Sequence, residues 1–358
     1  MTRRALDLAA AGAGLVSPNP LVGCVIVSKE SEIVGEGAYV YASVTHAEVI
    51  ALEQAGARAK GGTAYVSLEP HSHHGKTFPC TEALIDAGIA RVVATIEDPN
   101  PLVSGQGFQA LRDAGIEVLT GVLADEATKL NEKFICWHEK GRPFIHLKMA
   151  TSLDGRISLG RSISTAFSSE EALRRVHEMR HEHDAILVGA NTVVVDDPSL
   201  TDRSGLQRRR KLVRVILDNR LRTSADSTVV KTAGETPTII VSNSTDREKR
   251  RELAAPGVDF VVEDSRNLHA VLSALRQRDI QSILVEGGTE VAGAFRDSDL
   301  IDKLSLMIAP RIIGGTTAPL AFGGRGASSI EEAAMLTDIS VTRHGRDIEI
   351  TGYPSRST

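Results

Sequence analysis

The chain has 358 residues, enough for two domains of ordinary size. Hydrophobic residues make up 42% and charged residues 24%, an ordinary balance for a globular protein, and the net charge of −5 argues against a nucleic-acid partner. No apolar run approaches the ~18 residues of a membrane span. The three cysteines form no CxxC pair, so we expect a cytoplasmic protein without a disulfide framework or a membrane partner.

The first part of the chain, residues 1–141, alternates short β-branched runs with helical patterns, which predicts a layered α/β domain. The predicted strands are residues 21–28, 63–68, 91–96 and 116–120, and the predicted helices are residues 46–55, 81–87, 107–114 and 125–138. A glycine and a proline within Lys140-Gly141-Arg142-Pro143 interrupt the pattern, so we place a domain boundary after residue 141.

The second part, residues 142–358, repeats this alternation. The predicted strands are residues 144–150, 185–189, 212–218, 238–242, 282–286, 303–309 and 347–351, and the predicted helices are residues 170–180, 268–278 and 289–295. The basic run from Arg208 to Lys211 lies in a polar stretch, residues 202–211, which we expect to be a solvated loop because short charge runs usually are.

The motif His46-Ala47-Glu48 begins a predicted helix, and Cys80 follows Pro79 at the start of another. Free N–H groups and the positive dipole end at a helix start favour a thiolate. A catalytic zinc needs three protein ligands and one open position, with a nearby uncoordinated carboxylate to carry the proton. These residue types therefore predict a hydrolytic zinc site, and zinc deaminases combine H-x-E with P-C in this way.

Taken together, the runs PNPLVG, HAEV, TAYVSLEP, SHHGKT, LKMATSLDGRI, ILVGANTVVVDDPSLT, VEGG and APRIIGG resemble the bifunctional deaminase/reductase family of riboflavin biosynthesis. The resemblance covers nearly the whole chain. It implies a cytidine-deaminase-like three-layer α/β/α domain over residues 1–141 and a dihydrofolate-reductase-like α/β domain over residues 142–358. The implied reactions are zinc-dependent deamination of 2,5-diamino-6-(5-phosphoribosylamino)pyrimidin-4-one and NADPH-dependent reduction of its ribosyl group to ribityl.

The resemblance also implies the residues of each site. In the deaminase domain these are the zinc ligands His46, His71 and Cys80, the proton carrier Glu48, and the substrate-binding residues Asn19 and Lys76. In the reductase domain the implied NADPH contacts are Ala150, Thr192, Asp196, Gly288, Thr289, Glu290, Val291, Ala292, Gly293 and Ala294. The implied substrate contacts there are Ser164, Arg180, Leu200, Arg203 and Glu286. The family also implies a homo-oligomer, either a dimer or a tetramer.

This sequence departs from the family pattern at four positions. His71 stands where the family has Cys, Tyr39 and Ile50 stand where it has His, and Ala166 stands where it has Trp, whose place we expect Phe167 to take. These departures leave open an alternative in which the deaminase domain is a folded relic and only the reductase is active. A second alternative is a metallopeptidase, because His177 to His181 match HExxH, although no third ligand motif follows.

Overall fold

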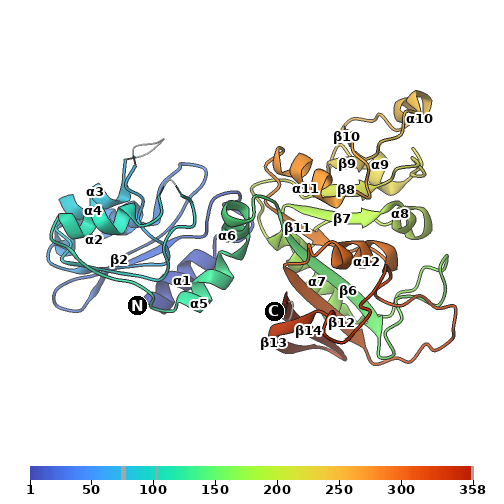
Figure 1. Ribbon diagram of the computed structural model, residues 1–358. Coiled ribbons are helices and arrows are strands. Elements are labelled where there is room, and N and C mark those ends of the chain that lie inside the picture. The colour runs from blue at the N-terminus through green and yellow to red at the C-terminus, as the bar shows by residue number, and fades with distance from the viewer. Residues whose placement is uncertain (74–77, 102, 356–358) are drawn as a thin grey trace. The chain divides into compact units, whose positions relative to one another are not determined.

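The computed structural model describes residues 1–73, 78–101 and 103–355 and divides the chain into two compact units, Met1–Arg142 and Pro143–Thr358 (Figure 1). This division lies one residue from the boundary that the sequence suggests. Among the described residues, no helix combines the length and the apolar character that crossing a membrane requires.

Unit 1 contains a five-stranded mixed sheet with the strand order β2-β1-β3-β4-β5. Strand β1 pairs antiparallel with β2 and β3, and β3, β4 and β5 are parallel. The elements are α1 (Thr2–Ala10), β1 (Gly23–Val27), β2 (Ile33–Ala38), α2 (Ala47–Ala55), the 3₁₀ helix η1 (Gly56–Ala59), β3 (Thr63–Val66), α3 (Cys80–Asp86), β4 (Arg91–Ala94), α4 (Gln106–Asp113), β5 (Glu117–Leu119), α5 (Ala124–Leu130) and α6 (Glu132–Glu139).

Helices cover both faces of this sheet (Figure 1). Helices α2, α3 and α4 pack on one face over a core that includes Ile26, Leu84 and Leu111. On the other face, Ala5 of α1 packs against Val25 and Val27 of β1. The three-layer α/β/α arrangement expected from the resemblance is therefore confirmed.

Strand β2 was not predicted because two glycines interrupt its apolar alternation. A Cβ atom on Gly35 would lie 1.9 Å from the carbonyl oxygen of Ala51, and one on Gly37 would lie 2.2 Å from that of Ala47. The glycines thus let the backbone of α2 approach the sheet directly. This close packing fixes the helix whose first turn carries Glu48.

The prediction of one continuous helix over residues 125–138 is wrong, since the structure breaks it at Asn131 into α5 and α6. The Asn131 side chain, only 2% exposed, accepts a hydrogen bond from the backbone N–H of Leu21 at 2.8 Å and donates one to the Leu21 carbonyl at 3.0 Å. An asparagine amide satisfies a neighbouring backbone in this way more readily than it sits inside a helix. The break therefore ties the end of unit 1 to the turn that carries Asn19.

Unit 2 contains a nine-stranded sheet with the order β10-β9-β8-β7-β11-β6-β12-β14-β13. All pairs from β10 to β12 are parallel, and β14 and β13 add an antiparallel edge. The elements are β6 (Phe144–Ser152), α7 (Glu170–Glu182), β7 (Ala185–Gly189), α8 (Ala190–Asp196), β8 (Val213–Leu217), α9 (Thr228–Lys231), β9 (Thr238–Val241), α10 (Arg247–Glu252), β10 (Val258–Val261), α11 (Leu268–Arg276), β11 (Ser282–Val285), α12 (Thr289–Asp297), β12 (Lys303–Ala309), β13 (Met335–His344) and β14 (Asp347–Ser355).

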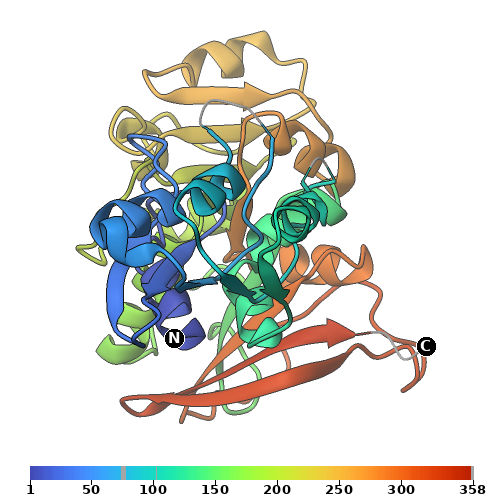
Figure 2. The same ribbon diagram turned by 90° about the vertical axis from the view of Figure 1, so that its left-hand side faces the viewer.

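The core of unit 2 also lies on both faces of its sheet. Helices α11 and α12 bury Leu272, Leu275 and Phe295 on one face, and α7 buries Val176 and Met179 on the other. Figure 2 shows α10 and β10 near one end of this unit and the long β13–β14 hairpin near the other. The dihydrofolate-reductase-like class expected for this part of the chain is confirmed.

The basic run lies in a loop, as the sequence suggested, but Arg208 and Arg210 are half-buried rather than solvated. The guanidinium of Arg208 donates to the carbonyls of Arg180, His181 and His183 at 2.8, 2.9 and 2.6 Å. Arg210 donates to the Asp279 carbonyl at 2.7 Å. Since the last carbonyls of a helix have no partner within it, Arg208 acts as a cap for the end of α7.

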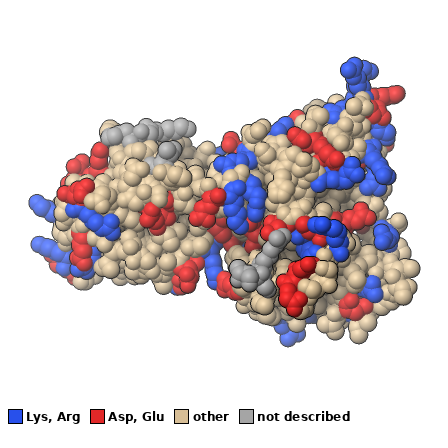
Figure 3. All heavy atoms as spheres, viewed as in Figure 1, with Lys and Arg blue, Asp and Glu red and all other residues tan. Residues whose placement is uncertain are grey.

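Over the face drawn in Figure 3, Lys and Arg side chains are interspersed with Asp and Glu. That mixture agrees with the acidic net charge and gives no continuous basic surface on this face.

Candidate functional site

The three predicted zinc ligands come together in unit 1. The ligand atoms of His46, His71 and Cys80 all lie within 4.8 Å of one another, with both imidazoles half-buried and the thiol buried. The two imidazole rings stack with their centroids 4.4 Å apart. A two-imidazole, one-thiolate set suits a zinc ion with one open coordination position.

Two helix starts and one loop hold these ligands. His46 is the N-cap of α2, and Cys80 is the first residue of α3 directly after Pro79. The carbonyl of His71 accepts hydrogen bonds from the backbone N–H and the hydroxyl of Thr81, at 3.3 and 3.4 Å. This clamp joins the loop that carries one ligand to the helix that carries another.

The protonation state of the ligands fits a cation. Burial, with the nearby His46 and His73, lowers the pKa of His71 to about 4, so its imidazole is neutral and able to coordinate. Its buried Nδ1 has no hydrogen-bond partner among the described residues. Burial and the adjacent Glu48 raise the pKa of the Cys80 thiol, and a bound metal ion is the charge that would reverse this.

Glu48 lies in the first turn of α2 and is 2% exposed. Its Oε2 atom is buried without a hydrogen-bond partner among the described residues. A buried carboxylate oxygen that no protein group satisfies is costly unless a ligand or ion meets it. This carboxylate beside a three-ligand cluster is therefore free to carry a proton.

Asn19 and Tyr39 lie beside the metal cluster. The Asn19 amide Nδ2 donates to the Tyr39 hydroxyl at 2.6 Å, and the Tyr39 ring meets the His46 ring edge-on at 5.5 Å between centroids. Ile50, the other departure from the family pattern in this domain, faces Gly37. Lys76, expected to contact the substrate phosphate, lies outside the described residues.

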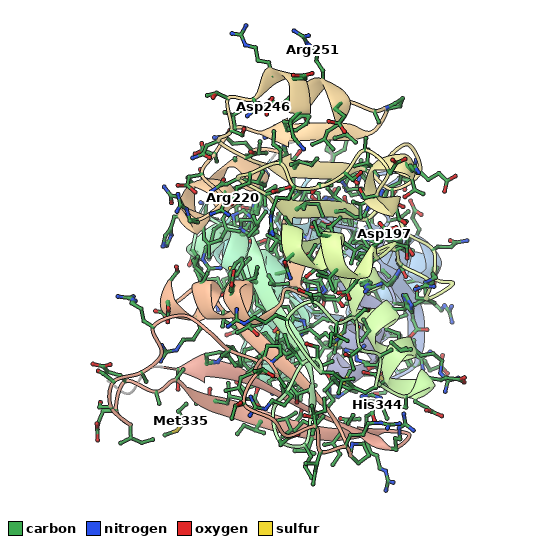
Figure 4. All side chains as sticks on the ribbon, turned by 90° about the vertical axis from the view of Figure 1, so that its right-hand side faces the viewer. Asp197, Arg220, Asp246, Arg251, Met335 and His344 are labelled. Atoms are coloured by element: carbon green, nitrogen blue, oxygen red, sulfur yellow. The ribbon has the colours of Figure 1, made fainter. Side chains whose placement is uncertain are left out.

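Unit 2 contains a cavity of about 1370 Å³ at the carboxyl ends of its parallel strands, the edge at which open α/β sheets bind ligands. Its walls include Gly189 at the end of β7, Asn219 after β8 and Asn243 after β9. Arg220 also lines it, and Figure 4 shows this side chain on the loop after β8, whereas Asp246 and Arg251 of α10 lie near the end of the unit.

Most of the residues predicted to contact NADPH line this cavity. They are Thr192, Asp196, Gly288, Thr289, Glu290, Val291 and Ala294, together with the predicted substrate contact Ser164. Three others lie outside its lining, because Ala150 packs under α7, Ala292 is in the core, and a Cβ on Gly293 would lie 2.4 Å from the backbone of Gly323. Ala166 lines the cavity, but Phe167 is buried outside it and does not replace the missing ring.

Two of the predicted substrate contacts, Arg180 and Glu286, form an ion cluster with Lys148, and the three side chains are only 11–12% exposed. Arg180 holds the Glu286 carboxylate with two hydrogen bonds, at 2.7 and 3.1 Å, and Lys148 Nζ lies 3.7 Å from the same carboxylate. Burial alone would raise the pKa of Glu286, but Arg180 and Lys148 outweigh it and lower that pKa to about 2. Leu200 is buried with φ of 49°, and Arg203 is exposed.

Comparison with known proteins agrees with both sites. The family model of the RibD C-terminal domain matches residues 143–350, and that of the cytidine and deoxycytidylate deaminase zinc-binding region matches residues 1–96. A riboflavin biosynthesis protein RibD from Bacillus amyloliquefaciens is 42% identical over 98% of this chain and 94% of its own length. This chain belongs to the RibD family.

Other members of the RibD family are similar over the same extent. The RibD of Aquifex aeolicus is 42% identical over 97% of this chain and 95% of its own length. The solved structure of Acinetobacter baumannii RibD superimposes with a TM-score of 0.86 at 34% identity, covering 99% of this chain and 98% of that chain. A Thermotoga maritima structure described as a diaminohydroxyphosphoribosylaminopyrimidine deaminase/5-amino-6-(5-phosphoribosylamino)uracil reductase gives a TM-score of 0.87 at 35% identity, covering 99% and 97%.

The HExxH motif does not form a metal site in this RibD-family chain. His177 Nδ1 accepts the backbone N–H of Arg203 at 3.2 Å, and His181 Nδ1 lies 3.2 Å from Asp202. Within the described part of the chain, the cluster around Cys80 is the one group of side chains with metal-binding geometry. The two histidines of HExxH instead hold the loop that follows α8.

Sequence reasoning missed two charged residues that are largely shielded from solvent. Lys148 is the one lysine in the mainly apolar strand β6. A single cation in such a strand is the sequence signal that could have identified it. Glu69 is 4% exposed and accepts four backbone hydrogen bonds, including those of Gly105 and Gly107 at 2.9 and 2.8 Å. It fixes the start of α4 close to the strand end that leads to His71.

Proposed function

We propose that this chain performs both reactions of the RibD family: zinc-dependent deamination of 2,5-diamino-6-(5-phosphoribosylamino)pyrimidin-4-one, then NADPH-dependent reduction of the ribosyl group. The observation that carries the first activity is the cluster of His46, His71 and Cys80 within 4.8 Å, beside the buried Glu48 side chain, whose Oε2 atom has no hydrogen-bond partner among the described residues. A degenerate deaminase would have no need to leave that buried oxygen without a partner.

In the deaminase unit, His46, His71 and Cys80 would hold the zinc ion. When bound, zinc supplies a Lewis acid that makes water nucleophilic near neutral pH. Glu48 takes a proton from the attacking water at Oε2 and delivers it to the departing amino group, which leaves as ammonia. Asn19 holds the pyrimidine edge with its amide, and Lys76 neutralises the substrate phosphate.

In the reductase unit, the cavity at the strand ends would receive NADPH, which supplies a hydride when bound. Thr192, Asp196 and the start of α12, from Gly288 to Val291, would orient it together with Ala294, because backbone N–H groups at a strand-to-helix turn suit a pyrophosphate. The other predicted contacts, Ala150, Ala292 and Gly293, do not line the cavity and are not part of this proposal. Ser164, Leu200, Arg203 and Arg180 would bind the sugar phosphate, with Glu286 holding the guanidinium fork of Arg180 in place.

We also propose that the protein is a cytoplasmic homo-oligomer. Its three cysteines are buried and form no disulfide with one another, as expected in a reducing compartment. The edge strand β13 exposes Met335, Ile339 and Val341, and a long apolar edge of this kind is usually covered by a partner. Analytical ultracentrifugation of the purified protein tests this, and a monomer at micromolar concentration would refute it.

One experiment tests both activities. The purified protein is incubated with the diaminopyrimidine substrate and NADPH, while ammonia release and NADPH oxidation are followed separately. We expect both products, with ammonia formed first. If the protein oxidises NADPH only when it is given the deaminated substrate, and releases no ammonia from the diaminopyrimidine, the deaminase unit is a relic.

The matched variant is Glu48→Gln, which keeps the shape of the side chain but cannot carry the proton. We expect ammonia release to fall by about 10²- to 10⁴-fold, the usual contribution of a general acid/base. The zinc content and the reduction of deaminated substrate should stay at their wild-type values. Unchanged ammonia release would remove Glu48 from the reaction.

A further inference from the structure

Tyr39 contacts two residues of the deaminase site at once. Its hydroxyl accepts the hydrogen bond from Asn19 at 2.6 Å, and its ring packs edge-on against the ring of His46, with an interplanar angle of 65°. The side chain is 7% exposed. Tyr39 thus connects the proposed pyrimidine-binding amide to a metal ligand through a single rigid ring.

The backbone fixes this position of Tyr39. Its N–H donates to the Val22 carbonyl at 2.9 Å, next to strand β1. The following loop is closed by the antiparallel bridge of Val40 with Thr45, whose two hydrogen bonds measure 3.0 and 3.1 Å. Because that bridge joins the residues just after Tyr39 and just before His46, it brings the two rings together.

Asn19 is held from the other side by backbone contacts. Its N–H donates to the Val16 carbonyl at 2.9 Å, and the adjacent Leu21 is clamped by the Asn131 amide. These contacts fix the main chain but leave the rotation of the Asn19 amide undetermined. Among the described residues, Tyr39 is the group that engages this amide, and it engages Nδ2.

We propose that Tyr39 is a positioning residue that, through its hydrogen bond with Nδ2, holds the Asn19 amide in the rotation observed beside His46. With Nδ2 directed to the tyrosine hydroxyl, the acceptor Oδ1 is the atom presented to a ligand. Asn19 therefore recognises a hydrogen-bond donor on the pyrimidine, an amino group or a ring N–H. This inference rests on the proposed deaminase function and deepens it.

The test is a double-mutant cycle on ammonia release with Tyr39→Phe and Asn19→Ala. Tyr39→Phe removes the hydroxyl but keeps the ring on His46. We expect the KM for the pyrimidine to rise about 2- to 12-fold, the range for one neutral hydrogen bond, with kcat changed by less than about two-fold. In the Asn19→Ala background, Tyr39→Phe should have no further effect on KM.

The control is Tyr65→Phe, which removes a hydroxyl from β3 on the face of the sheet that packs against α1. We expect wild-type KM, kcat and zinc content for it, and wild-type zinc content for Tyr39→Phe. Additive effects of Tyr39→Phe and Asn19→Ala on KM would overturn the proposal, as would a loss of zinc in Tyr39→Phe or a KM that does not change.

The role of Tyr39 and the proposed deaminase activity can be refuted separately. A wild-type protein that binds zinc and releases ammonia, but gives an additive cycle, would refute only the role of Tyr39. A wild-type protein that releases no ammonia would refute the proposed deaminase activity. In that case, calorimetry measures the dissociation constant of the unreacted pyrimidine for each protein of the double-mutant cycle. Additive effects of the two substitutions on this constant would again overturn the role of Tyr39.

Discussion

Glu286 is the shared acidic partner of two cations in the reductase unit, Arg180 and Lys148. The folded pKa of this carboxyl is about 2, well below its value of about 4.3 in an unfolded chain. The unfolded state therefore binds more protons in this range, and folding stability rises with pH. The contribution is present above about pH 4.3 and is lost as the pH falls toward 2.

We expect Glu286→Gln to lower the free energy of unfolding by about 3–5 kcal/mol at neutral pH, because it leaves two buried cations without their carboxylate. Between pH 4.5 and 2, the free energy of unfolding of the variant should fall by about 3 kcal/mol less than that of the wild type. Urea unfolding across this pH range measures both effects. Parallel pH profiles for the two proteins would contradict this role of the carboxylate.

His71 stands where the family has Cys, but its side chain can still bind zinc. An imidazole and a thiolate are both zinc ligands, and His71 lies in the same cluster as Cys80. We expect His71→Ala to weaken zinc binding by more than the roughly 10- to 100-fold that losing a ligand's hydrogen-bond partner costs. We expect His71→Cys to retain stoichiometric zinc. Elemental analysis after dialysis separates these outcomes, and full zinc in His71→Ala would remove this residue from the ligand set.

Helix α4 begins at a carboxylate from a different part of the chain. The Glu69 side chain accepts N–H groups from the first turn of this helix, which would otherwise be unsatisfied. The approach is so close that a Cβ atom on Gly107 would lie 1.9 Å from the Pro70 carbonyl oxygen. The helix and the strand end before His71 are thus built as one packed piece.

In an ordinary helix Gly→Ala is stabilising, but Gly107→Ala should destabilise unit 1 by roughly 1–3 kcal/mol, the usual cost of overpacking. The exposed neighbour Gln106→Ala serves as the control and should leave stability nearly unchanged. Thermal unfolding followed by circular dichroism measures both variants. A stabilised Gly107→Ala protein would show that this contact is absent in solution.

The predicted zinc ligands belong to one compact unit, and the cavity proposed for NADPH belongs to the other. A metal that binds only the folded state stabilises the unit that holds it, in proportion to the logarithm of its concentration.

Removing zinc with excess chelator should therefore abolish ammonia release and lower the unfolding temperature of unit 1. Reduction of the deaminated substrate by NADPH should continue at its wild-type rate. Calorimetry with and without chelator, beside the two activity assays, tests this separation. A parallel loss of NADPH oxidation would show that the units depend on each other.

The sequence predicted that His46, His71 and Cys80 would come together and predicted most of the α/β elements, although it missed β2, β10 and β13. His46, Glu48 and Cys80 lie at helix starts marked by local signals, and the predicted strands are short β-branched runs whose pattern is visible within a few residues. Only the tertiary structure decided that Asn131 breaks a helix to hold Leu21 and that Arg208 caps α7. The tertiary structure also showed that the glycines of β2 let the backbone of α2 pack closely on the sheet. It showed that the Tyr39 hydroxyl accepts a hydrogen bond from Asn19. Each of these depends on groups far apart in the chain, and such pairings leave no periodic trace in the sequence.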